Sequence, residues 1–94
     1  MSQAIEEEND GLACLSEQRH DDAAVSFARA VDLWRPLGST VWLARSLVML
    51  GEAYRRAGDR SGSTSARSRA RRVLVRLNTP VAERQKVMDV LTDR

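Results

Sequence analysis

The segment LGEAYRRAGD, Leu50 to Asp59, is the part of this 94-residue chain that best indicates its fold. Gly51 lies inside a helical pattern, where a glycine costs about 1 kcal/mol relative to alanine. Its presence indicates that a neighbouring helix packs too closely to leave room for a side chain. Gly58 and Asp59 then supply a C-terminal stop and a new N-cap. The segment therefore predicts a helix, a tight turn and a second helix packed against the first.

Helical patterns extend from this segment in both directions, and no alternating β-branched run predicts a strand. We expect helices over about 2–18, 21–36 and 39–57, a fourth ending near 77, and a short fifth over 80–91. Asp21 is the expected N-cap of the second helix, and Pro36 with Gly38 is its expected end. Residues 61–65 are poor helix formers, so the fourth helix is expected to start late or to fray there.

Length and composition predict one small domain over residues 1–94, and the helical patterns make it all-α. Hydrophobic residues make up 43% of the chain and aromatic residues only 4%, so the core must be mostly aliphatic and alanine. The single cysteine, Cys14, excludes an internal disulfide and favours a reducing compartment. The acidic start of the chain does not resemble a secretory leader, and no apolar run is long enough to span a bilayer. We therefore expect a cytoplasmic protein without membrane contact.

An internal repeat of 40 residues connects the two halves of the chain. This shift aligns Gly11 with Gly51 and Cys14 with Tyr54. Both glycines then fall in the first helix of a helix pair. A fixed period of this kind is the usual indication of a repeat architecture.

The repeated pattern resembles the tetratricopeptide repeat family. The second unit matches the family's first helix and turn, and the first unit matches its second helix; the matching residues are Leu47, Leu50, Gly51, Ala53, Tyr54, Gly58 and Asp59, then Ala23, Phe27 and Ala30. The resemblance implies a right-handed stack of antiparallel helix-turn-helix units, with unit 1 over 2–36, unit 2 over 39–77 and a capping helix over 80–91. Cys14 replaces an aromatic residue of the pattern. Ser63 and Arg67 also depart from it, unless three residues are inserted so that Ala66, Ala70 and Val73 take the expected places.

Function in this family rests on the groove lined by the first helices of successive units. The resemblance assigns ten groove positions: Ile5, Glu8, Leu12, Leu15 and Ser16 in unit 1, and Arg45, Val48, Glu52, Arg55 and Arg56 in unit 2. Among these, the residues that we expect to bind a partner are Leu12, Leu15, Arg45, Val48, Glu52, Arg55 and Arg56. Arginine pairs with carboxylates in bidentate geometry, so an acidic peptide or a C-terminal carboxylate suits this set. The alternative is that these arginines form an ordinary solvated helix face. The sequence thus predicts a non-catalytic protein-interaction module, a scaffold, adaptor or partner-binding part of a regulatory system.

Nucleic-acid binding is the alternative function. Residues 55–76 hold eight arginines and one acid, whereas residues 1–32 hold eight acids and two arginines. Five of these arginines form the candidate basic patch on the expected fourth helix: Arg67, Arg69, Arg71, Arg72 and Arg76. Such a patch can neutralise phosphates, but that helix lacks aromatic residues and the acidic first third repels the same ligand.

No pattern in the chain predicts an enzyme, a metal site or a cofactor. His20 is the only histidine and falls in an expected turn, and Cys14 occupies an inward repeat position without a basic partner. Trp34 and Trp42 bracket the RPLGST connection. They are either a stacking site for a ligand or, as we favour, a packing contact that fixes the angle of this turn.

Two repeat units are few for a stable stack, because each unit leaves an apolar face for a neighbour to cover. The opposed charges of the two halves add to this argument. We therefore expect the chain to form a homo-oligomer or to dock onto a larger protein, unless the helix over 80–91 closes the stack.

Overall fold

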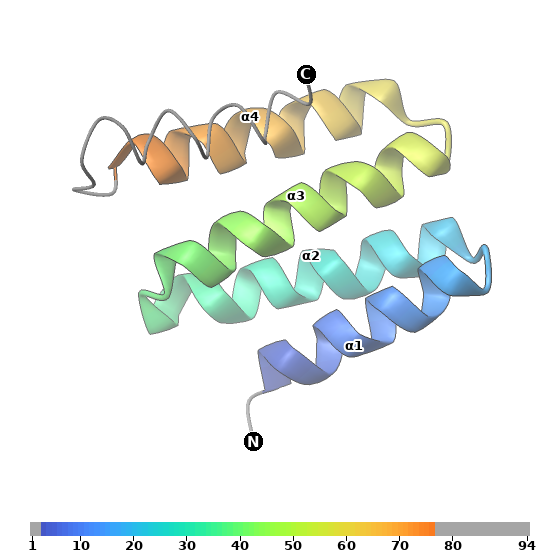
Figure 1. Ribbon diagram of the computed structural model, residues 1–94, viewed down its shortest axis with the longest axis horizontal. Helices are drawn as coiled ribbons and strands as arrows, with labels where there is room; N and C mark the ends of the chain where they lie inside the picture. Colours follow the sequence, from blue (N-terminus) through green and yellow to red (C-terminus); the bar gives the residue numbers. More distant parts are fainter. Residues whose placement is uncertain (1–2, 77–94) are drawn as a thin grey trace.

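The computed structural model describes residues 3–76, and this part of the chain consists of four α-helices without any β-strand. The helices are α1 (Gln3–Ser16), α2 (His20–Leu37), α3 (Thr40–Arg56) and α4 (Arg60–Arg76). Each helix packs on the next in chain order, so that they lie side by side as an antiparallel row (Figure 1). The all-α prediction is confirmed for these residues. The expected helix over 80–91 lies outside the described residues.

The helices form two helix-turn-helix units, hairpin 1 (α1 and α2) and hairpin 2 (α3 and α4). The first helices end at Ser16 and Arg56, and the second begin at His20 and Arg60, so both pairs of boundaries are 40 residues apart. The turns also make matching backbone hydrogen bonds. The amides of Gln18 and Arg19 donate to Leu15 and Cys14, and the amides of Gly58 and Asp59 donate to Arg55 and Tyr54.

This bond pattern is a Schellman motif, in which the residue after the helix adopts a left-handed conformation. Gly58 has φ 88° and Gln18 has φ 63°. Glycine reaches this region at little cost, whereas glutamine is a less common occupant. The 40-residue register is therefore a property of the backbone and not only of the sequence, and no residues are inserted in hairpin 2.

Two sequence-based boundaries are wrong, the N-cap of α2 and the C-terminal end of α1. Asp21 is not the N-cap of α2, because the Schellman turn after α1 already places Arg19 at that position. α1 ends at Ser16, two residues before the expected end at Gln18. The expected end of α2 at Pro36 and Gly38 is confirmed, because Pro36 lies in the last turn, the helix ends at Leu37 and Gly38 follows it with φ 68°.

The expected fraying of residues 61–65 is wrong as well. α4 begins at Arg60, and the carboxylate of Asp59 accepts a hydrogen bond from the Gly62 amide at 2.8 Å, which caps the helix. Ser63 and Ala66 are buried against the core. Capping and packing together outweigh the low helix propensity of this segment.

The core is built largely from alanine and aliphatic side chains, as the composition predicted. The main cluster joins all four helices around Phe27, Leu47 and Leu50, and Cys14 is buried in it. A smaller cluster places Ala4 and Ala30 around Trp34. Leu74 extends the main cluster along α4, on the stripe that also holds Ala66 and Ala70.

The close approach that Gly51 predicted is confirmed. A methyl group at Gly51 would lie 2.9 Å from Cγ of Arg67 on α4, and a methyl group at Gly11 would lie 2.7 Å from the ring of Phe27 on α2. The two glycines thus serve the same purpose 40 residues apart. In hairpin 1 the glycine admits an aromatic ring, and in hairpin 2 it admits an arginine stem.

Candidate functional site

The predicted binding residues of α3 share its outward face. Arg45, Arg55 and Arg56 are exposed, whereas Val48 and Glu52 are half-buried. Their spacing of three, seven, ten and eleven residues from Arg45 places them along one side of the helix. α3 therefore presents a face that is apolar at Val48 and charged toward its C-terminal end.

The predicted residues of α1 are apolar and only partly accessible. Leu12 is 40% exposed, whereas Leu15 is half-buried and packs on the main core. Ile5, another position of the expected groove, is also exposed. α1 thus offers a narrow apolar surface in place of the charges of α3.

Glu52 occupies the charged end of this face with two arginines. Its carboxylate accepts hydrogen bonds from Arg55, at 3.1 and 2.5 Å, and from Arg56 at 2.7 Å. The Arg55 hydrogen bond, reinforced by Arg56, lowers the pKa of Glu52 to about 2 although partial burial opposes this shift. The two arginines expected to bind an acidic partner therefore already share one carboxylate of the chain, and the three groups together carry a net charge of +1.

Glu8 is a second carboxylate that the sequence placed incorrectly. Its repeat position assigned it to the groove, but it is only 4% exposed. It accepts hydrogen bonds from Nε1 of Trp34 at 2.9 Å and from the hydroxyl of Ser46 at 2.5 Å. Arg45 lies 3.7 Å from its other oxygen. Burial of this charge is tolerated because donors from α2 and α3 surround it.

The two tryptophans pack against each other beside this carboxylate. Their ring centroids are 5.5 Å apart with an interplanar angle of 19°, and the guanidinium of Arg45 lies 5.3 Å from the ring centroid of Trp42. Trp34 is buried, whereas Trp42 is 41% exposed. The stack joins the end of α2 to the start of α3, so the packing contact that we favoured for this turn is present.

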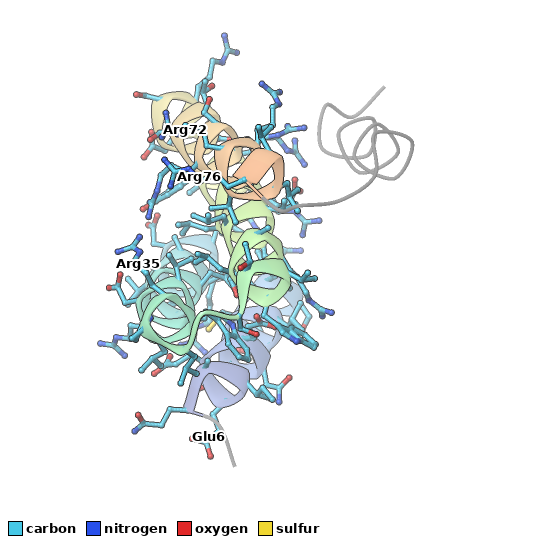
Figure 2. The ribbon with its side chains drawn as sticks, turned by 90° about the vertical axis from the view of Figure 1, so that its left-hand side faces the viewer. Glu6, Arg35, Arg72 and Arg76 are labelled. Atoms are coloured by element: carbon cyan, nitrogen blue, oxygen red, sulfur yellow. The ribbon has the colours of Figure 1, made fainter. Side chains whose placement is uncertain are left out.

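The candidate basic patch does not form one continuous face. Arg67 and Arg71 lie on one side of the buried stripe of α4, and Arg69, Arg72 and Arg76 lie on the other. Arg72 and Arg76 are at the opposite end of the row of helices from Glu6 (Figure 2). The buried Nε of Arg71 has no hydrogen-bond acceptor within residues 3–76.

A hollow at the turn of hairpin 2 was missed by the sequence analysis. It has a volume of about 540 Å³ and is lined by Arg55, Gly58, Arg60, Ser63, Thr64 and Arg67. The spacing of Arg60, Ser63, Thr64 and Arg67 places these four residues on one side of a helix that starts at Arg60. The sequence analysis missed this spacing because it expected residues 61–65 to fray.

Between residues 3 and 76, no three or more His, Cys, Asp or Glu side chains are grouped to hold a metal ion. None of the helices α1 to α4 is long and apolar enough to cross a membrane.

Comparison with known proteins gives no relative for this chain. No family model, no curated protein and no solved structure matches it.

Proposed function

We propose that this chain is a non-catalytic protein-interaction module, a tetratricopeptide-like scaffold or adaptor that belongs to a cytoplasmic regulatory system. The observation that carries the proposal is that α1 and α3 expose four large apolar side chains, Ile5 and Leu12 on α1 and Val41 and Trp42 on α3. Exposed apolar side chains gathered on one surface mark contact sites more often than scattered ones do. The arginines at the end of α3 add a charged margin to the same face.

The repeat geometry supports this proposal. Two hairpins with matching turns hold α1 and α3 as the first helices of successive units. Helical repeats use such first helices as an extended binding surface. A partner segment with apolar side chains and one acidic group complements Leu12, Val48 and the net positive charge around Glu52.

Self-association is one form that the proposed interaction takes. Residues 3–37 hold eight acids and three arginines, and residues 40–76 hold nine arginines and two acids. Contact between hairpin 1 of one copy and hairpin 2 of another is therefore electrostatically favourable. Sedimentation velocity at low and high salt tests this form, and a monomer at every concentration under both conditions would remove it.

Partner capture with matched variants tests the module itself. Leu12→Ser removes an exposed apolar side chain from α1, and Val25→Ser makes a comparable change on α2, where Val25 is 50% exposed. We expect the wild type and the Val25 variant to recover the same proteins, and the Leu12 variant to lose them. Direct binding to the purified partner, with circular dichroism to verify folding, completes the test. Equal recovery by all three chains would contradict the proposed face.

A further inference from the structure

The hollow at the turn of hairpin 2 differs in charge from other hollows of the structure. Its lining contains three arginines, two hydroxyl residues and a glycine, and no carboxylate. Two hollows on hairpin 1, of about 350 and 460 Å³, are each lined by several carboxylates, among them Glu6 and Glu7 in one and Glu17 in the other. The hollow of hairpin 2 is therefore the one suited to an anion among these three.

Hairpin 1 shows that the backbone does not require this lining. Positions 40 residues before the lining residues share the same turn and helix start but are mostly apolar: Leu15, Gln18, His20, Ala23, Ala24 and Phe27. Packing of the repeat is thus satisfied by alanine and phenylalanine at positions where hairpin 2 has serine, threonine and arginine. Hairpin 2 therefore has hydrogen-bond donors at positions where hairpin 1 packs with apolar side chains.

The aliphatic stem of Arg67 lies against α3 at Gly51. Its Cγ lies where a side chain of residue 51 would be, so Gly51 lets the stem lie against α3. Restriction of an arginine side chain before binding reduces the entropy lost on binding. The guanidinium is therefore partly pre-organised at the hollow.

The charges around the hollow leave an excess of two positive charges. Arg55, Arg60 and Arg67 line it and Arg56 shares Glu52 with Arg55, so these four arginines are set against Glu52 and Asp59. Glu52 is shared by Arg55 and Arg56, and the carboxylate of Asp59 receives the Gly62 amide. Because the Gly62 amide is bonded to Asp59, a ligand in the hollow would meet side-chain donors and not this amide.

We propose that this hollow binds a phosphomonoester. A phosphomonoester carries close to two negative charges at neutral pH and accepts hydrogen bonds on three oxygens. Arginines from two helices line the hollow together with Ser63 and Thr64, so its donors lie in several directions around a bound group. A single planar carboxylate would use fewer of these directions than a phosphate does. The inference goes beyond the proposed function, because phosphate binding is measured with no partner protein present.

Titration with inorganic phosphate and with O-phosphoserine at low ionic strength tests the proposal, with binding followed on the backbone amides by nuclear magnetic resonance. We expect saturable shifts at Ser63, Thr64 and Arg67. The double variant Arg60→Gln with Arg67→Gln retains the Cγ that packs on Gly51, and it should weaken binding at least about tenfold.

The double variant Arg72→Gln with Arg76→Gln is the matched control, since it removes the same charge from exposed positions of the same helix. It should weaken binding by less than about threefold. Thr64→Val gives a second measurement if the arginine variant fails to fold, and it should weaken binding about threefold through loss of one neutral hydrogen bond. Absence of saturable binding by either phosphate probe, or an equal loss in the control, would overturn the proposal.

The source of the phosphate is distinguished by a phosphoserine peptide and its unphosphorylated counterpart. Equal affinity for the peptide and for free phosphoserine supports a small phosphorylated molecule, and tighter binding of the peptide supports a phosphorylated partner. A DNA strand without a terminal phosphate is the third probe. Tighter binding of this strand, with the Arg72 and Arg76 variant as damaging as the Arg60 and Arg67 variant, would replace the proposal with a nucleic-acid surface.

Discussion

Hairpin 1 places Phe27 against Gly11, whereas hairpin 2 places Arg67 against Gly51, although the turns of both hairpins make the same hydrogen bonds. The same difference between apolar and charged residues is found on the first helices, where Leu12 and Leu15 of α1 correspond to Glu52 and Arg55 of α3. One backbone thus carries an apolar interior at one end of the row and an arginine-lined surface at the other. The comparison teaches that backbone repetition and surface chemistry are separable in this chain.

The largest expected effect compares Phe27 with Arg67. Phe27 is fully buried, so Phe27→Ala should lower the free energy of unfolding by about 3–5 kcal/mol. Arg67→Ala removes only a partly exposed stem and should cost about 1 kcal/mol. Urea denaturation followed by circular dichroism measures both. Equal losses would mean that the two positions are energetically equivalent and would break the comparison.

The next effect concerns Glu8, whose counterpart in hairpin 2 is Val48. Glu8→Val leaves the Trp34 and Ser46 donors without their acceptor, which should cost about 2–3 kcal/mol. Glu7→Val, a change of the same kind at a half-buried neighbour, should cost less than about 0.5 kcal/mol. Tryptophan fluorescence during urea unfolding reports on both variants. Similar stabilities would show that the buried carboxylate is not needed.

A smaller difference is expected between the two packed glycines. Gly11→Ala forces a methyl group against the buried Phe27 ring and should cost about 1–3 kcal/mol. Gly51→Ala displaces the Arg67 stem from its place on α3, but this stem is only partly buried, and the gain in helix propensity offsets the cost to within about 1 kcal/mol of zero. Thermal unfolding of the two variants measures this difference. A larger loss of stability for Gly51→Ala than for Gly11→Ala would show that the packing at Gly51 is the more rigid of the two.

The smallest expected effect is the pH dependence of Glu52. Its pKa is lowered to about 2 in the folded chain, from an ordinary value of 4.5, so its stabilisation is present above about pH 4.5 and is lost as the pH falls toward 2. Glu52→Gln should therefore lower stability at neutral pH by less than about 1 kcal/mol, because the pair is solvent-screened. The difference from wild type should disappear near pH 2. A difference that grows on acidification would contradict this sign.

The sequence predicted the parts of the fold that depend on local residues. Gly51 predicted a close helix, Gly58 and Asp59 predicted the turn, and the inward position of Cys14 predicted its burial. Each signal lies within one hairpin, where spacing along the chain determines spacing in space.

The sequence did not predict features that need two distant segments. Glu8 has the pattern of a surface residue, and its partners Trp34 and Ser46 lie 26 and 38 residues away. The arginine-lined hollow combines the end of α3 with the start of α4, and poor helix propensity concealed the second half of it. The expected groove residues are partly brought together on α3, while the pairing of Arg55 and Arg56 with Glu52 depends on side-chain conformations that spacing alone does not fix.

The carboxylate of Glu8 has a consequence for the order of unfolding. It connects α1 to α2 within hairpin 1 and also to α3 of hairpin 2. In repeat proteins, neighbouring units behave as separate or joint folding units according to the strength of the interface between them. Unfolding of α1 would remove the Glu8 acceptor from Trp34 on α2 and from Ser46 on α3. The two hairpins therefore unfold as one cooperative unit.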